Sequence, residues 1–179
     1  MKKIIKNISL FSNAGIGEYG TNNISIQFNN IEYNVKTVIS NELLKERAKI
    51  YKNNYPLSNM ICGSITDYNI FSKIISSFKK ELPTIGTFSP PCQGSSGLNA
   101  FKGKSNDFRN QLVKSIFQLF EKTKENNTLE YGYIENVTSY YGEEVPVLLY
   151  NLDRPEVPEL INDYIEIEKT FTTESKKIK

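Results

Sequence analysis

The 179-residue sequence has no histidine, only two cysteines and no long apolar segment, and each shortage excludes a class of protein. Without histidine, Ser-His-Asp and Cys-His catalysis are excluded and an ordinary zinc site is disfavoured. Two cysteines, Cys62 and Cys92, argue against a disulfide framework and for free thiols in a reducing cytoplasm. Because no 18 apolar residues run together and no apolar stretch of signal-peptide length follows the N-terminus, neither a membrane span nor secretion is expected.

Charge is unevenly distributed along the chain, although the net charge is only +2. Residues 1–141 hold 17 basic and 11 acidic side chains, whereas residues 142–179 hold 5 basic and 9 acidic ones. We therefore expect a core over 1–141 and an acidic extension with one further strand over 142–179. A mildly basic body can approach a polyanion, but this is not the pattern of an autonomous DNA-binding module.

Apolar runs alternate with segments of helical spacing, which predicts an α/β fold with a mostly parallel sheet and helices on both faces. The ligands of such sheets lie beyond the carboxyl ends of the strands. Helices are expected after the glycine-rich loop that contains Gly15 and Gly17, and over 42–55, 68–82 and 109–126. Strands are expected over 3–12, 33–42, 59–65, 84–90, 129–137 and 164–172.

Residues 10–20, LFSNAGIGEYG, match the spacing G-x-G-x-x-G between a predicted strand and a helix. Glycines at 15 and 17 allow the backbone to turn tightly and approach a nucleotide closely. A flexible strand-to-helix turn is the alternative. Glu42, at the end of the second predicted strand, suits a ribose contact. It equally suits the N-terminal charge of the following helix.

Two further residues stand at predicted strand ends. Cys92 follows two prolines in FSPPCQGSSG, where a stiff backbone would present its sulfur as a nucleophile. Cys62 better fits a small buried side chain. Glu135 in YIENV, flanked by Ile134 and Val137, is expected to be half-buried and able to share a proton with a ring nitrogen. A carboxylate satisfied by a neighbouring backbone amide is the alternative for Glu135.

In order and spacing, LFSNAGIGEYG, SNE, CGSI, SPPCQG, DFRNQLV and IENV resemble the cytosine carbon-5 DNA methyltransferase family over about residues 7–140. PPCQ followed about forty residues later by ENV is the specific part of the resemblance. It implies a Rossmann-like S-adenosylmethionine-dependent methyltransferase fold, truncated at the C-terminal end. It further implies S-adenosyl-L-methionine as cofactor and DNA as substrate.

The resemblance also implies a role for each matching residue. Cys92 would attack carbon 6 of a flipped-out cytosine and Glu135 would bond its ring nitrogen 3, so that carbon 5 accepts the methyl group. Cofactor contacts are implied for Phe11, Gly15, Gly17, Glu42, Ser64, Ile65, Pro90 and Leu112. Substrate contacts are implied for Pro91, Gln93, Arg109, Asn136 and Val137.

Three departures from the family pattern stand out. Glu18 occupies a position where the family has glycine, and a negative side chain beside the carboxylate of the cofactor would cost binding unless it points away. Ser64 replaces an adenine-binding aspartate, for which Asp67 is a distant substitute. Only three arginines are present and no R-x-R pair, so we expect this chain to lack the base-contacting arginines and the target recognition domain that the resemblance implies.

Three interpretations remain open. The chain is one subunit of a split methyltransferase of a restriction-modification system, with a second polypeptide supplying the target recognition domain. Alternatively it is a truncated remnant that binds a nucleotide or a partner, or it acts on cytosine in RNA. A dehydrogenase is disfavoured because nothing in the sequence handles a hydride and PPCQ would have no role.

Overall fold

The computed structural model describes residues 1–91, 112–123 and 129–135, all within one compact unit that extends from Met1 to Val145. In chain order, the described elements are β1 (Lys2–Leu10), α1 (Ile16–Asn22), β2 (Ser25–Phe28), β3 (Ile31–Glu42), α2 (Lys45–Asn54), β4 (Asn59–Cys62), α3 (Tyr68–Glu81), β5 (Ile85–Phe88), α4 (Val113–Thr123) and β6 (Tyr131–Ile134).

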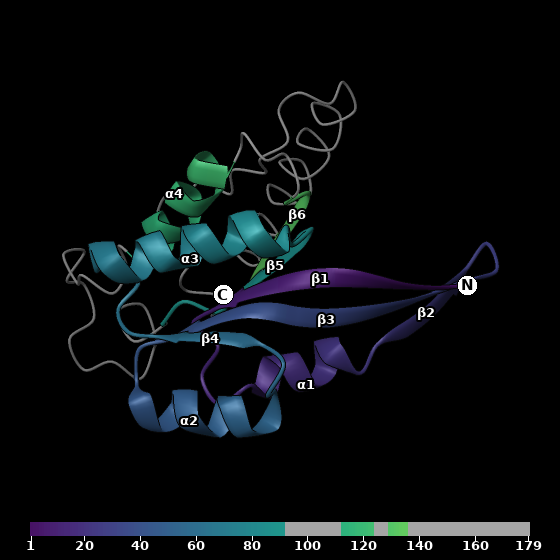
Figure 1. Cartoon of the computed structure of the whole chain (residues 1–179), viewed down its shortest axis with the longest axis horizontal. Coiled ribbons are helices and arrows are strands. Elements are labelled where there is room, and N and C mark those ends of the chain that lie inside the picture. The colour runs from purple at the N-terminus through teal and green to yellow at the C-terminus, as the bar shows by residue number, and fades with distance from the viewer. Residues whose placement is uncertain (92–111, 124–128, 136–179) are drawn as a thin grey trace, which may run out of the picture. The chain divides into compact units, whose positions relative to one another are not determined.

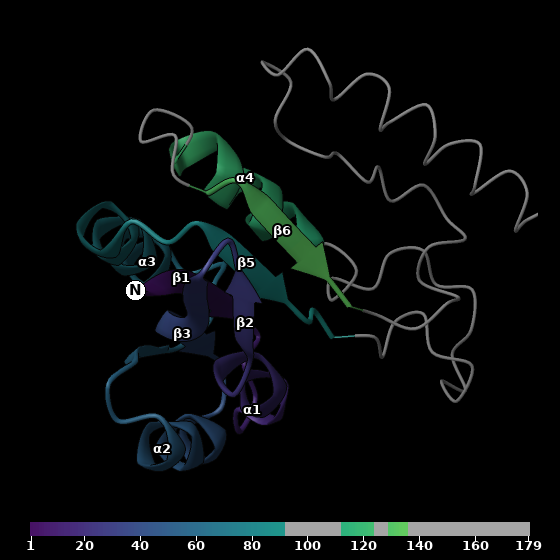
Figure 2. The same ribbon diagram turned by 90° about the vertical axis from the view of Figure 1, so that its right-hand side faces the viewer.

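The described strands form one sheet in the order β2-β3-β1-β5-β6, and β4 pairs with β3 on the same side as β2. β3 is long enough for both, because β2 lies along Ile31–Asn34 and β4 along Ile39–Glu42. Only β2, among these strands, is antiparallel to its neighbour. Helices α1 and α2 cover one face and α3 and α4 the other (Figures 1 and 2). The predicted α/β class is confirmed.

The apolar core lies between the sheet and helices α3 and α4. Ile74 and Phe78 are four residues apart on α3, so both point to the sheet, and both are fully buried. Asp67 begins this helix by accepting hydrogen bonds from the backbone N–H groups of Asn69 and Ile70 at 2.9 and 3.0 Å. The buried cluster consists of Ile8, Leu10, Ile39, Ile61, Ile65, Ile74, Phe78, Phe88, Val113, Ile116 and Leu119.

The opposite face of the sheet carries buried polar side chains beneath α1 and α2. Successive residues of a strand point to opposite faces, so Asn7 and Ser9 on β1 point away from the core that contains Ile8. Asn7 Nδ2 donates to Thr37 Oγ1 at 3.0 Å and to Thr87 Oγ1 at 3.1 Å. These bonds join the central strand β1 to both of its neighbours and fix the polar face below the strand ends.

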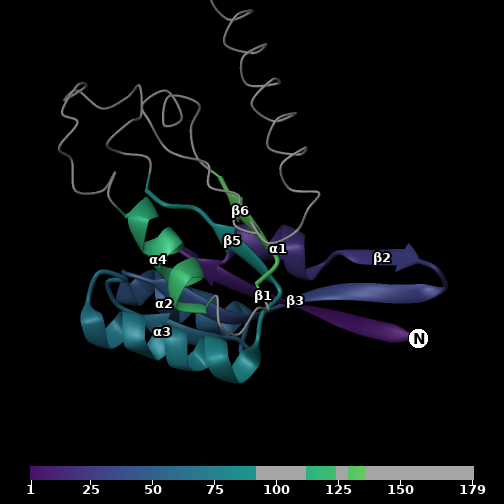
Figure 3. The same ribbon diagram turned by 90° about the horizontal axis from the view of Figure 1, so that it is seen from above.

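β2 is an element that is not expected from the sequence. It pairs with the start of β3 through a two-residue turn, with Phe28 opposite Ile31. The turn residues Asn29 and Asn30 have φ angles of 48° and 60°, and asparagine tolerates this left-handed conformation better than most residues. Two asparagines between the alternating segments ISIQF and IEY are the signal for this hairpin, which extends past the helices (Figure 3).

Candidate active site at the strand ends

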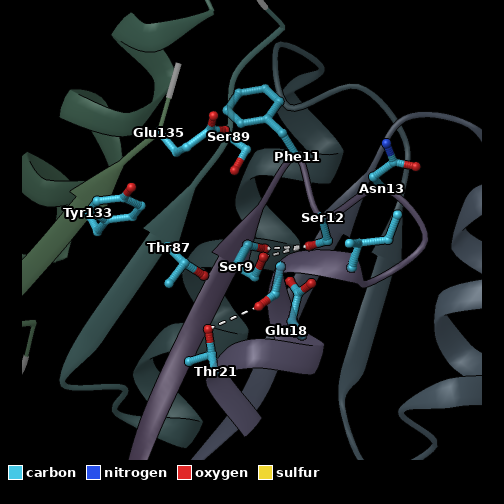
Figure 4. Close-up of a pocket in the computed structure, with 12 residues that line it drawn as sticks. Ser9, Phe11, Ser12, Asn13, Glu18, Thr21, Thr87, Ser89, Tyr133 and Glu135 are labelled. Carbon is cyan, nitrogen blue, oxygen red and sulfur yellow. Dashed lines mark hydrogen bonds between the residues drawn. The ribbon is translucent and has the colours of Figure 1, made fainter. Parts of the chain in front are cut away.

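A hollow of about 400 Å³ opens beyond the carboxyl ends of β1, β5 and β6. β1 has β3 on one side and β5 on the other, and this reversal of strand order is where open α/β sheets leave a crevice for a ligand. The volume falls within the range of about 300–1,000 Å³ typical of small-molecule sites. The hollow is lined by Ser9, Phe11, Ser12, Asn13, Ile16, Gly17, Glu18, Thr21, Thr87, Ser89, Tyr133 and Glu135 (Figure 4).

Strand register explains why polar side chains face the hollow. Ser9 on β1 is the partner of Thr87 on β5, which is the partner of Tyr133 on β6. These three residues form one row across parallel strands and therefore share one face of the sheet. The next row, which belongs to the apolar core or packs against it, consists of Leu10, Phe88 and Ile134.

Glu42 fastens the glycine-rich loop to the end of β3. Its Oε2 accepts a hydrogen bond from the Asn13 backbone N–H at 2.9 Å, and its Oε1 accepts one from the Leu44 N–H at 3.0 Å. Leu44 directly precedes α2, so the carboxylate also serves the start of that helix. Glu42 is buried and does not line the hollow, and its predicted ribose contact stays a prediction.

Gly15 and Gly17 of the loop have different surroundings, which explain in different ways why glycine suits each position. Gly15 has φ +89°, and a Cβ there would overlap the ring of Tyr55, whose hydroxyl donates to the Gly15 carbonyl at 2.9 Å. Glycine is therefore required at position 15 by the backbone conformation and by the neighbouring Tyr55 ring, without reference to any ligand. Around Gly17 a Cβ would meet nothing within 4 Å, although Gly17 lines the hollow. Open space at this position fits the close approach of a ligand.

Glu18 brings a carboxyl group into the wall of the hollow instead of pointing away from it. The residue is only 3% exposed. Burial raises the pKa of Glu18 above its ordinary value, while hydrogen bonds from the side chains of Ser9 and Ser12 and from its own backbone oppose that shift. Figure 4 shows Ser9, Ser12 and Glu18 grouped together below Phe11.

Several predicted cofactor residues lie elsewhere in the described structure. Ile65 is part of the apolar core, and the half-buried Leu112 packs against it. The Ser64 hydroxyl lies 2.8 Å from that of Thr66, and Asp67 caps α3. The predicted residues that do not line the hollow are Gly15, Glu42, Ser64, Ile65, Pro90 and Leu112. Their cofactor contacts stay predictions.

The expectation that Glu135 is half-buried is wrong, because its side chain is exposed. Its backbone N–H still donates to the Phe88 carbonyl at 2.9 Å, but the residue follows the last paired position of β6 and faces the hollow instead of the core.

Cys62, expected to be buried, is half-buried on β4. Other predicted residues, Cys92, Gln93, Arg109, Asn136 and Val137, lie outside the described residues. Pro91, the last described residue before Cys92, is half-buried.

The hollow also contains residues that were not predicted. Ser9, Thr87 and Tyr133 could have been found from strand alternation, since each stands next to an apolar core residue in its strand. Ser12 and Asn13 have no such signal. They depend on the path of the loop, in which Phe11 and Asn13 adopt φ angles of 61° and 52°.

No group of three or more acidic or cysteine side chains among the described residues could hold a metal ion. No helix of that part of the chain is both long and apolar enough to cross a membrane.

Comparison with known proteins identifies related sequences and folds. The family model described as C-5 cytosine-specific DNA methylase matches residues 5–144. The type II methyltransferase M1.HgaI of Avibacterium volantium is 37% identical over 140 residues, which are 76% of this chain and 36% of that protein. The chain thus spans about a third of the length of this curated relative.

Solved structures share the fold at low sequence identity. A protein assigned as a DNA modification methyltransferase, encoded in an E. coli prophage, matches with a TM-score of 0.54 and 20% identity over 78% of this chain and 34% of that chain. A mutant of DNMT2 from Spodoptera frugiperda matches with a TM-score of 0.50 and 19% identity over 80% of this chain and 39% of that chain. Both support the Rossmann-like class of the sheet.

Replacing Gly15 with alanine is expected to lower the free energy of unfolding by about 1–3 kcal/mol, because the left-handed backbone and the Tyr55 ring both oppose a side chain. Urea unfolding would measure the loss. Gly20→Ala is the matched control, since a Cβ at Gly20 meets nothing within 4 Å. Equal stability of the two variants would contradict this account of Gly15.

Glu18→Gln is expected to gain stability relative to the unmodified chain as pH rises. Because the folded pKa of Glu18 is raised, the unfolded chain ionises first, and the stability of the unmodified chain falls between the ordinary and the raised pKa. Glutamine does not titrate, and the nearby Tyr51 and Tyr55 have raised pKa values and stay neutral over this range. Urea unfolding at pH values from about 4 to 8 tests this. A difference that is independent of pH would contradict it.

Proposed function

Because the chain belongs to the C-5 cytosine-specific DNA methylase family, we propose that it carries the cofactor-binding and catalytic core of a DNA cytosine-5 methyltransferase. Residues 1–141 form this core, and residues 142–179 are an acidic extension. The observation that carries the proposal is the meeting of Phe11, Gly17 and Glu135 at one hollow. These residues come from two motifs of the family resemblance that are more than a hundred residues apart in the sequence.

S-adenosyl-L-methionine is the proposed cofactor, and when bound it supplies the methyl group. The hollow fits such a molecule because it combines an aromatic ring at Phe11, backbone open to close approach at Gly17 and hydroxyl groups at the strand ends. The ring of Phe11 stands beside Ser89 and Glu135 in Figure 4. An aromatic face suits an adenosyl or sulfonium group. Glu42 contributes by holding Asn13 and hence the loop in place.

Cys92 is the proposed nucleophile. The Ser89 backbone N–H bonds the Leu10 carbonyl at 3.3 Å, and Pro90 is buried, so the chain leaves β5 fixed beside the hollow two residues before Cys92. The thiolate adds to carbon 6 of the target cytosine, and carbon 5 then takes the methyl group. Loss of the carbon 5 proton to a base and release of the sulfur restore the aromatic ring, so that the cysteine is regenerated.

Glu135 is the proposed partner of the cytosine ring. Its exposed carboxyl at the tip of β6 faces the hollow, where it can hold a proton against ring nitrogen 3 while sulfur is bonded to carbon 6. The Phe88–Glu135 backbone bond keeps this tip beside the end of β5. Such a reaction needs the base outside the duplex, since a stacked base cannot be attacked from above its ring. Pro91, Gln93, Arg109, Asn136 and Val137 are proposed to contact the extruded base and its strand.

A second polypeptide is proposed to supply the target recognition domain, as in a split enzyme of a restriction-modification system. The 179 residues contain only three arginines and no R-x-R pair. In the described part of the sheet, β6 pairs with β5 alone, and its Tyr131 and Tyr133 are 64% and 63% exposed. Exposed aromatic side chains on this strand suit burial against a further chain.

Cys92→Ser is expected to abolish covalent trapping of DNA that contains 5-fluorocytosine, because carbon 5 of that base has no proton to lose and the sulfur adduct persists. The test uses the chain expressed with the second polypeptide proposed above, followed by denaturing electrophoresis. Cys62→Ser is the matched control, since Cys62 is half-buried on β4 away from the hollow, and it should trap normally. Undiminished trapping by Cys92→Ser would refute the nucleophile, and no trapping by the unmodified pair would refute the activity.

A further inference from the structure

The hollow has an unbalanced set of charged side chains. Among the residues that the structure describes, its lining includes two carboxyl groups, Glu18 and Glu135, and no lysine or arginine. Glu135 is exposed to solvent, whereas Glu18 is 3% exposed. A wall of this composition favours a ligand that presents a positive charge, and the favoured place for that charge is beside the buried carboxyl.

Glu18 has hydrogen-bond donors but no cation among its described neighbours. Its partners are the side chains of Ser9 and Ser12 and its own backbone, and the described ion pairs are formed instead by Glu32 and Glu81. The Ser12 hydroxyl also donates to Ser9 Oγ at 2.9 Å, which joins the two hydroxyls that contact the carboxyl. A carboxylate has about four acceptor sites, and these contacts leave room for a further donor.

Removing a carboxylate from water without pairing it is costly, and proteins usually compensate with a counter-ion. Nothing in the described apolar core requires the charge, because Glu18 lies on the polar face of the sheet, close enough to the buried Tyr51 to interact with it electrostatically. The only described opening beside Glu18 is the hollow itself. The missing counter-ion is therefore best supplied by a ligand in the hollow.

We propose that Glu18 binds the ammonium group at the amino-acid end of the cofactor and selects adenosyl ligands that carry this group. The assignment rests on the proposed function, because it needs the cofactor to occupy the hollow. It gives a role to the residue that departs from the family's glycine. Ser9 and Ser12 act as positioning residues that orient the carboxyl toward the ligand.

The test is a cycle of two ligands and two proteins, measured by calorimetric titration of the 179-residue chain. The ligands are S-adenosylhomocysteine and its analogue that lacks only the amino group. The proteins are the unmodified chain and Glu18→Gln, with Glu46→Gln, an exposed carboxyl on α2, as the control. Loss of the amino group should weaken binding about tenfold to hundredfold for the unmodified chain and for the control. For Glu18→Gln the two ligands should bind within a few-fold of each other.

The outcomes distinguish a ligand-binding role of Glu18 from a structural role and from the absence of a cofactor site. If the amino group matters equally in Glu18→Gln and in the unmodified chain, the carboxyl is a structural group and the assignment is overturned. If neither ligand binds any of the proteins, the cofactor site itself is rejected and the role of Glu18 with it. If Glu18→Gln does not fold, the unmodified chain still tests the assignment, because equal affinity of that chain for the two ligands overturns it.

Discussion

The site depends on the carboxylate of Glu42, which joins the ends of the two central parallel strands. By accepting hydrogen bonds from Asn13 and Leu44, it holds the loop that leaves β1 against the turn that leaves β3. Bonds to a charged acceptor are about twice as strong as neutral ones. The loop can therefore keep Phe11, Asn13 and Gly15 at positive φ angles, and the hollow between β1 and β5 stays open.

Much of the fold follows from local patterns, and what was missed has a physical reason. Apolar alternation in β1, β3 and β5 and the four-residue spacing of Ile70, Ile74 and Phe78 give the strands, the helices and the face that each buries. The β2 hairpin was missed because it depends on two asparagines in a left-handed turn instead of on glycine. Its strand is exposed at every position, so burial gives no signal.

The residues of the site are harder to predict from the sequence than the fold is. Motif spacing located Phe11, Gly17 and Glu135, which meet at the hollow although the first and last lie at opposite ends of the described chain. The sequence could not distinguish the two glycines, although the Tyr55 ring requires a glycine at position 15 and open space surrounds Gly17 at the hollow. Neither could it foresee that Glu18 would be buried in the wall, because that depends on Ser9 and Ser12 meeting it from a different element.

The central claim is that the hollow at the ends of β1, β5 and β6 binds the adenosyl cofactor. Calorimetric titration of S-adenosylhomocysteine into the chain and its Gly17→Val variant tests it most directly, with Gly20→Val as control. Both glycines lie on α1 with open space around them, but only Gly17 lines the hollow. The account predicts one-to-one binding that falls at least tenfold for Gly17→Val and is unchanged for Gly20→Val. Equal binding by all three proteins, or none by the unmodified chain, would contradict it.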